Sequence, residues 1–286
     1  MSGLSLFQLL NGVTFAALLF IVASGFTLIF GLLRIVNLAH GALYLMGGYC
    51  GYAVASASGN FFVGALAAMV CVGLAGLALD RGLLRFVGGN ELRQVLLTLG
   101  VAFVVNDLLL VVFGGDTFTV PTPDFLRGAL HVGTMFYPKY RLFVLGLGIA
   151  LFCVLWLMLY RTRLGALIRA GVDDPETIQA MGVNIRRIFL LTFMLGAALA
   201  GLGGAVGGAF LTLYPSADAE ILVFSLAVVI IGGRGSLLGA AVGALMVGLL
   251  NSIGQVMFPE FAYFVIFGPM ALILAFRPYG LFGRAA

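Results

Sequence analysis

The stretch VLLTLGVAFVVNDLLLVVF, residues 95–113, shows the pattern that decides the fold of this chain. It carries a single charge and approaches the roughly 20 apolar residues that an α-helix needs to cross the hydrocarbon core of a bilayer. Similar runs fill most of the 286 residues, of which 62% are hydrophobic and 9% charged, with a mean hydropathy of +1.17. Soluble domains of this length do not have such a composition. The sequence therefore predicts a polytopic membrane protein.

Helices are the expected membrane-crossing elements. In lipid every backbone N–H and C=O must be bonded internally, and the continuous apolar runs lack the alternation of a β-barrel. The predicted spans are residues 8–30, 40–57, 61–79, 95–113, 142–160, 188–213, 221–233, 237–257 and 261–276. The seventh is too short to cross alone. We therefore expect an all-α transmembrane bundle of eight or nine spans, with a broken or re-entrant helix near residues 221–236 as an alternative.

Basic residues are distributed unevenly over the connections between these spans. Placing the arginine-rich segment 161–187 in the cytoplasm also assigns to that side Arg34, Arg81, Arg85, Arg93, Arg234, Arg277 and Arg284. Only Arg127, Lys139 and Arg141 then lie outside, as the excess of basic residues on the inner side of membrane proteins requires. Nine spans would place the N-terminus outside and the C-terminus inside. The net charge of +4 is thus a topology signal and predicts no nucleic-acid binding.

Glycine is abundant, with 41 residues, and many glycines are spaced four apart. Such pairs are Gly47 with Gly51, Gly203 with Gly207, Gly204 with Gly208, Gly235 with Gly239, and Gly239 with Gly243. Small residues at this spacing allow the backbones of membrane helices to approach closely. The pairs therefore predict a tightly packed bundle.

The charged segment RTRLGALIRAGVDDPETIQAMGVNIRR, residues 161–187, interrupts the apolar runs. Asp174 suits an N-cap, Pro175 the first helical position and Gly182 the end of a helix of about two turns. Apolar residues recur there at spacings of three and four, namely Ile178, Met181 and Ile185. One apolar face on an otherwise solvated helix predicts docking to a soluble partner.

The rest of the chain shows no hydrophilic domain or linker, so residues 1–286 are expected to form a single transmembrane domain. The longest external connection is residues 114–141. Loops of this length are usually functional or carry short structure of their own. This one could cap the outer mouth or receive a soluble partner, and a plain connector is the alternative.

Several function classes are disfavoured by missing residues. A phosphate-binding loop needs the pattern G-x-x-x-x-G-K-[ST], and the one lysine lies outside any such pattern. Asp173, Asp174 and Glu176 lack the second acidic cluster of a metal–diphosphate site, so helix capping and docking explain them better. With only His40 and His131, no Ser-His-Asp or Cys-His arrangement is available. We expect neither enzymatic activity nor a cofactor.

Two groups of polar residues lie at or within apolar runs. Asn37 and His40 begin the second run, where the imidazole could line a pathway or be a buried histidine bonded to a carbonyl. Asp107 lies within the fourth run beside Asn106, and Thr98 precedes it by nine residues on the opposite helix face. A carboxylate at such depth is by default a functional candidate. The alternative is an ion pair with Arg127, Lys139 or Arg141.

Four stretches together resemble the permease subunits of bacterial branched-chain amino acid ABC transporters. They are residues 24–49 (SGFTLIFGLLRIVNLAHGALYLMGGY), residues 161–208, residues 228–245 (VVIIGGRGSLLGAAVGAL) and residues 277–283 (RPYGLFG). The resemblance covers nearly the whole chain. It implies one membrane-spanning half of an importer in the bacterial inner membrane.

The same resemblance implies partners. They are a second permease chain, expected to be a paralogue, two cytoplasmic ATP-binding subunits that bind the ATP, and a periplasmic solute-binding protein. Residues 161–187 are similar to the cytoplasmic coupling loop, with Ala180, Met181 and Gly182 matching its Ala-x-Gly core, although the Glu-Ala-Ala start found in other importers is absent. Family members carry branched-chain amino acids, urea, short amides or aromatic acids. A secondary transporter driven by an ion gradient is the alternative, but it should show more intramembrane ionisable residues.

Overall fold

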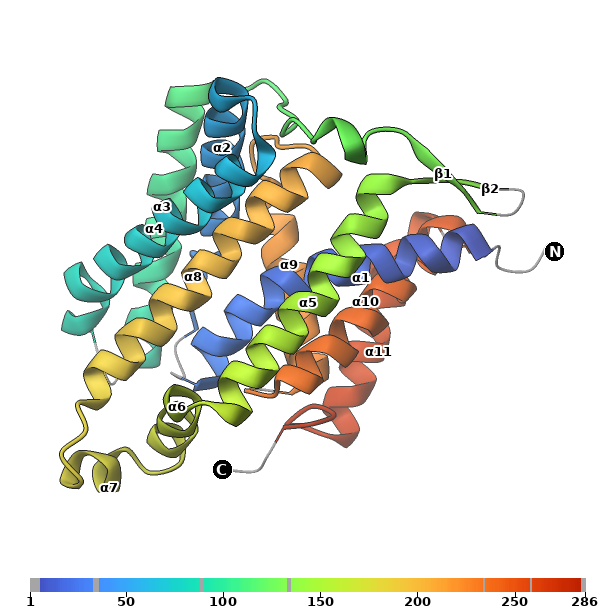
Figure 1. The fold of residues 1–286 in the computed structure, drawn as a ribbon. Coiled ribbons are helices and arrows are strands. Elements are labelled where there is room, and N and C mark those ends of the chain that lie inside the picture. Colours follow the sequence, from blue (N-terminus) through green and yellow to red (C-terminus); the bar gives the residue numbers. More distant parts are fainter. Residues whose placement is uncertain are drawn as a thin grey trace.

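The computed structural model describes residues 6–32, 36–87, 90–132, 135–233, 235–257 and 259–283, so Arg34, Arg234 and Arg284 lie outside the described residues. The described chain is mostly helical (Figure 1). The long helices are α1 (Leu6–Thr27), α2 (His40–Ser58), α3 (Phe61–Gly82), α4 (Glu91–Phe113), α5 (Lys139–Arg161), α8 (Ile185–Phe210), α9 (Ala217–Gly232), α10 (Leu237–Met257) and α11 (Ala262–Phe276). Shorter elements are α6 (Arg163–Asp173), α7 (Pro175–Ala180), β1 (Ala129–Val132) and β2 (Met135–Pro138), and η1 (Leu28–Leu32) is a π-helical turn.

Each predicted apolar run overlaps one of these long helices over most of its length. Six described helices are long and apolar enough to cross a membrane: α1 with η1, α3, α4, α5, α8 and α10. The others, α2, α9 and α11, have 19, 16 and 15 residues. The predicted all-α membrane bundle is thus confirmed. The irregularity considered near residues 221–236 is not within α9, which is one continuous helix up to Gly232.

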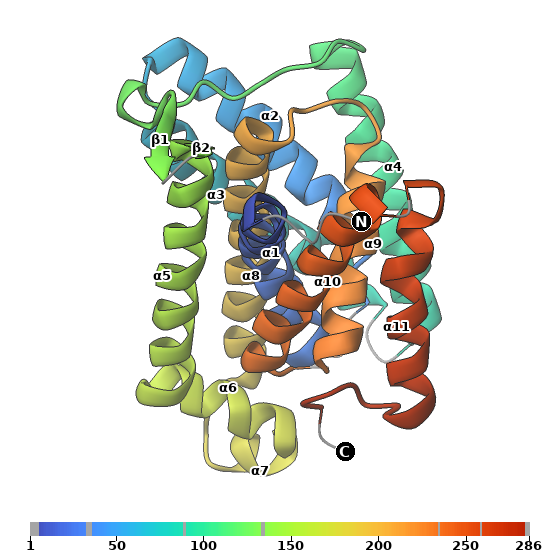
Figure 2. The same cartoon turned by 90° about the vertical axis from the view of Figure 1, so that its right-hand side faces the viewer.

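Helix α1 forms the centre of the bundle. All of residues 14–30 are buried, and α1 contacts α5, α8, α9 and α10. Figure 2, which views α1 nearly end-on, shows these helices around it. A helix that is apolar all round is expected to be buried on every side. By contrast, α4 exposes Phe103, Leu108 and Val111, whose exposed fractions are 62%, 58% and 82%, as expected of a surface that faces lipid.

The two ends of the bundle differ in character. Helices α6 and α7 lie at one end together with the C-terminal segment, whereas the β1–β2 hairpin and the α2–α3 connection lie at the other (Figures 1 and 2). The arginine-rich segment 161–187 forms the first end. By the distribution of basic residues, we refer to it as the inner end and to the opposite one as the outer end.

Small residues bring the helix backbones together, as the glycine spacing predicted. A Cβ added at Gly51 of α2 would lie 2.8 Å from the Cβ of Ala205 in α8, and one at Gly47 would meet the backbone of Gly201. Similar close approaches join Gly239 of α10 to Gly232 of α9. Larger side chains at these positions would hold the helices apart. The close packing fixes α2 against α8 and α9 against α10.

The chain turns back on itself between α1 and α2. The ring Nε2 of His40, the first residue of α2, lies 3.1 Å from the carbonyl oxygen of Val22. Val22 precedes the end of η1 by ten residues, or about 15 Å of helix. Helix α2 therefore begins well inside the bundle, and residues 36–39 form a buried return segment.

The external connection after α4 has structure of its own. Phe118 exchanges two backbone hydrogen bonds with Leu213, and the N–H of Val120 donates to the carbonyl of Gly208 at 3.2 Å. The side chain of Val120 is buried and lies beside Gly208 of α8. Strands β1 and β2 pair antiparallel with Ala129 opposite Pro138. This loop therefore covers the outer end of α8, and α5 begins at Lys139, earlier than predicted.

Candidate functional site

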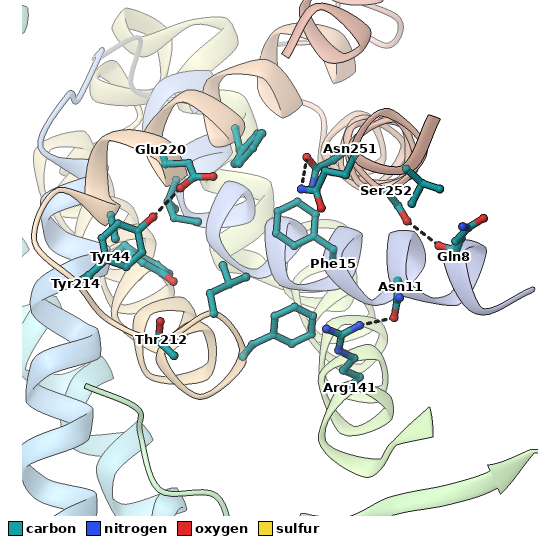
Figure 3. Close-up of a pocket in the computed structure, with 17 residues that line it drawn as sticks. Gln8, Asn11, Phe15, Tyr44, Arg141, Thr212, Tyr214, Glu220, Asn251 and Ser252 are labelled. Carbon is teal, nitrogen blue, oxygen red and sulfur yellow. Dashed lines mark hydrogen bonds between the residues drawn. The ribbon is translucent and has the colours of Figure 1, made fainter. Parts of the chain in front are cut away.

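A cavity of about 300 Å³ lies at the outer end of the bundle. Its walls come from α1, α5, α9 and α10, from Tyr44 of α2, and from Phe210 at the end of α8 with the segment 211–214 that follows it (Figure 3). Two charged residues line it, Arg141 at the start of α5 and Glu220 in the first turn of α9. Figure 3 shows them on different walls, with Phe15 of α1 lying between them. This volume suits a small molecule.

Each charged group is held by a neutral polar neighbour. The guanidinium of Arg141 donates to the Asn11 side-chain oxygen and lies 5.0 Å from the centre of the Phe210 ring. The carboxylate of Glu220 accepts a 2.7 Å hydrogen bond from the Tyr214 hydroxyl. These contacts orient both groups without neutralising either charge. Both groups retain hydrogen-bonding capacity for a ligand.

The polar remainder of the wall comes from Thr212 and from the ends of α1 and α10. The Ser252 hydroxyl donates to the carbonyl of Gln8 at 2.8 Å, and the Gln255 amide donates to the Asn251 side chain at 3.1 Å. Asn11 completes this group. The arrangement offers hydrogen bonds to a bound molecule, but it contains neither a nucleophile–base pair nor, among described residues, a group of three metal-ligating side chains.

The inner part of the cavity is apolar. Phe15 and Phe224 are buried and meet edge-on with ring centroids 5.7 Å apart, and Ile221 lies on the same wall. Tyr44 also lines the cavity, although only 1% of it is exposed. A side chain at Gly207 would clash with the Tyr44 hydroxyl, so this glycine makes room for the tyrosine.

Among the predicted pathway residues, Thr98, Asn37 and His40 support the buried return segment and do not line the cavity. The Thr98 hydroxyl donates to the carbonyl of Gln94 at 2.9 Å and accepts from the N–H of Leu38 at 3.1 Å. Asn37 accepts from the N–H of Ala39 at 3.1 Å. His40 is buried against the Val22 carbonyl, which matches the alternative of a histidine bonded to a backbone carbonyl.

Asn106 and Asp107 also lie outside the cavity. The Asn106 amide donates to Asp218 of α9 at 2.7 Å, whereas Asp107 is exposed and lines a smaller cavity of about 110 Å³. The ion pair considered as the alternative role of Asp107 does not form among the described residues. Arg127 pairs with Asp124 at 2.6 Å, and Arg141 bonds Asn11. Asp107 and the buried Thr98 do lie on opposite faces of α4, as predicted.

The inner end contains the predicted short helix. The Asp174 carboxylate accepts hydrogen bonds from the N–H of Thr177 at 3.0 Å and from its hydroxyl, and both bonds hold the pKa of Asp174 below its ordinary value. Pro175 begins α7, and Gly182 follows its end with φ 81°. The N-cap and the stop signal are therefore confirmed. The side chain of Asp173 lies outside the described residues.

The single apolar face predicted for this segment does not form. Ile178 and Ile185 are 9% and 8% exposed, whereas Met181 is 73% exposed. The reason is that α7 ends at Ala180 and Ile185 begins α8, so helical spacing does not extend across the three residues. Ile185 instead contacts Gly171 of α6, which the sequence did not predict as a helix. The exposed inner tip comprises Asp174, Glu176, Ala180, Met181 and Gly182.

None of the predicted pathway residues lines the outer cavity. Its residues come from positions 8 to 256, and no local sequence pattern connects them. Arg141 and the turn preceding α9 are recognisable in the sequence as external features. Only the fold brings them together, by placing the N-terminal ends of α1, α5 and α9 beside the C-terminal end of α10.

The fold and this site define a polytopic helical membrane protein with a solute-sized cavity. The family model described as branched-chain amino acid transport system, permease component, matches residues 8–274. The chain therefore belongs to this permease family, which is a transport family and not an enzyme family.

Individual relatives match over most of their length. The chain is 28% identical to the high-affinity branched-chain amino acid transport system permease protein BraD of Pseudomonas aeruginosa, over 97% of this chain and 95% of the relative. It is 27% identical to the corresponding LivH of Escherichia coli K12, with the same coverage. It is 26% identical to the ribose import permease protein RbsC of that bacterium, over 81% of this chain and 73% of the relative. No solved structure matches the chain.

Proposed function

We propose that this chain is the membrane-spanning permease subunit of an ATP-binding-cassette importer in the bacterial inner membrane. It would move branched-chain amino acids or a related small solute, driven by ATP hydrolysis in separate subunits. The names of BraD and LivH support the solute class. The importer would comprise a second, paralogous permease chain, two cytoplasmic ATP-binding subunits and a periplasmic solute-binding protein.

One structural observation carries this proposal: a single helix links the two ends of the molecule. Helix α8 begins at Ile185, which contacts α6 at the inner end, and it ends at Phe210 on the wall of the outer cavity. Its 26 residues span about 39 Å. A displacement of α6 and α7 would therefore be transmitted to the cavity through α8. Coupling requires that the ATP-binding subunits favour one position of this helix.

The exposed inner tip is the proposed docking surface for an ATP-binding subunit, as the sequence resemblance implied. Met181 offers an apolar anchor, surrounded by the small residues Ala180 and Gly182 and by Glu176. Ile178 and Ile185 would hold this tip to the bundle and would not touch the partner. At the outer end, residues 114–138 and 214–220 are the proposed contacts for the solute-binding protein.

A substitution at the tip tests the docking proposal. Met181→Asp should reduce co-purification of the ATP-binding subunits at least tenfold, because it places a charge where an apolar contact is expected. Leu130→Asp makes the same kind of change at an exposed position on β1, at the outer end, and should leave co-purification unchanged. Undiminished co-purification and ATP-dependent uptake with Met181→Asp would disprove docking at this tip. Solute uptake by this chain alone would instead indicate a secondary transporter.

A further inference from the structure

We propose that the outer cavity binds a small zwitterion, with the anionic group of the solute at Arg141 and its cationic group at Glu220. The proposal rests on the proposed transport function and deepens it by assigning the solute site. It also predicts which solute class the site accepts. Of the classes that the sequence resemblance left open, α-amino acids would bind, whereas uncharged amides and monoanionic aromatic acids would not.

Arg141 is suited to bind a carboxylate. Its planar guanidinium has five N–H donors in a fixed fork, and Asn11 accepts from one of its nitrogens. The Phe210 ring supports the guanidinium from one side, which restricts its orientation. Within the described chain, no acidic side chain pairs with Arg141. An anionic ligand would provide the missing counter-charge through two parallel hydrogen bonds.

Glu220 offers the complementary charge. One carboxylate oxygen accepts the Tyr214 hydroxyl at 2.7 Å, and a carboxylate has room for further donors on both oxygens. Glu220 has no ion-pair partner among the described residues either. A primary ammonium group supplies three donors in a compact volume and would match this acceptor.

The position of the two groups makes the cavity selective. They lie on different walls of the cavity (Figure 3). In the proposed complex each charge of the solute would meet one of them, whereas an anion would meet the repulsion of Glu220 and a cation that of Arg141. An uncharged amide would leave both groups without a counter-charge. The buried faces of Phe15, Ile221 and Phe224 provide an apolar surface for the side chain of the solute. A volume of about 300 Å³ restricts the ligand to a small molecule.

The test uses the complete permease and ATP-binding complex, purified without the solute-binding protein so that its selectivity does not contribute. Equilibrium binding of radiolabelled leucine is measured in competition with three unlabelled probes: 4-methylpentanoate, which lacks the ammonium group, 3-methylbutylamine, which lacks the carboxylate, and urea. The variants are Arg141→Gln and Glu220→Gln. Lys139→Gln and Glu260→Gln remove charges of the same sign at positions that do not line the cavity.

Leucine should bind, and Arg141→Gln and Glu220→Gln should each weaken its binding about tenfold or more, because each loses one charged contact. The matched controls should stay within about twofold, and Arg141→Lys should recover part of the loss. The three probes should compete at least tenfold less well than leucine. Equal competition by a probe with one charge or none, or control-like behaviour of either cavity variant, overturns the proposal.

A second measurement distinguishes this failure from failure of the proposed function. The wild-type chain is reconstituted with its ATP-binding subunits and binding protein in proteoliposomes, and leucine uptake is followed with and without ATP. ATP-dependent uptake together with unaffected cavity variants would refute the zwitterion site alone. Uptake that does not depend on ATP would refute the importer assignment and leave the binding result to be judged separately.

Discussion

At the scale of single residues, glycines in α8 decide how closely α2 can approach the centre of the bundle. A Cβ at Gly204 would overlap the carbonyl oxygen of Tyr44 and lie 2.6 Å from the backbone nitrogen of Gly48. Both neighbours are backbone atoms, which cannot move without shifting a helix. Because Tyr44 lines the outer cavity, this contact links helix packing directly to the shape of the site.

We expect Gly204→Ala to destabilise the protein by about 1–3 kcal/mol, as overpacking does in well-filled interiors. Gly100→Ala is the matched control, since Gly100 lies in α4 and a Cβ there would meet nothing within 4 Å. The control should remain within about 1 kcal/mol of wild type. Reversible unfolding in mixed detergent micelles would measure both. Equal stabilities of the two variants would contradict the close approach of α2 and α8.

At the scale of elements, the sequence predicted the helices that are determined by residues close together in the chain. The apolar runs indicated the long helices, and the Asp174, Pro175 and Gly182 pattern indicated α7, because the capping geometry depends on adjacent residues only. Helix α6 was not predicted, although its sequence is amphipathic and the Thr162 hydroxyl caps it by accepting from the N–H of Gly165 at 3.1 Å. Its buried face includes Ile168. The apolar face of Ile178, Met181 and Ile185 was misplaced because helical spacing was applied across the stop signal at Gly182, beyond which Ile185 begins α8.

The cap of α7 gives a prediction at this scale. Asp174→Ala should increase hydrogen exchange of the α7 amides several-fold, because the N–H of Thr177 loses its acceptor. Thr177→Val removes only the hydroxyl donor and should have a smaller effect. The Asp174 pKa is lower in the folded protein than its ordinary value of 3.8, so the ionised cap stabilises the folded state at every pH above 3.8. This stabilisation is lost as the pH falls from 3.8 through the lower pKa of the folded state. At neutral pH the Asp174 carboxylate is ionised, so the protection of the α7 amides against exchange should not depend on the titration of this group there. Equal exchange in wild type and Asp174→Ala would show that the cap does not hold α7.

At the scale of the whole molecule, the set of residues that lines the cavity could not be predicted from the sequence. Its two charges are Arg141 and Glu220, on different helices, and two further lining residues, Asn11 and Ser252, stand near opposite ends of the sequence. The apolar runs define how many helices there are but not which ends meet. The central position of α1 decides this, because α5, α9 and α10 all contact it.

This arrangement also fixes which residues water reaches from each side of the membrane, and cysteine labelling can test it. In a parent in which Cys50, Cys71 and Cys153 are replaced by serine, Gln255→Cys should react with a membrane-impermeant maleimide added outside, because Gln255 is exposed and lines the outer cavity. Met181→Cys should react only in inverted vesicles. Ser225→Cys, at a fully buried position of α9, should react from neither side. Helices α8, α9 and α10 separate Met181 from Gln255 in the chain, so the two positions are labelled from opposite sides when an odd number of these helices crosses the membrane. Labelling of Gln255→Cys and Met181→Cys from the same side would show that the outer cavity and the inner tip do not face opposite sides. The proposed transmission from the ATP-binding subunits to the cavity would then lose its physical basis.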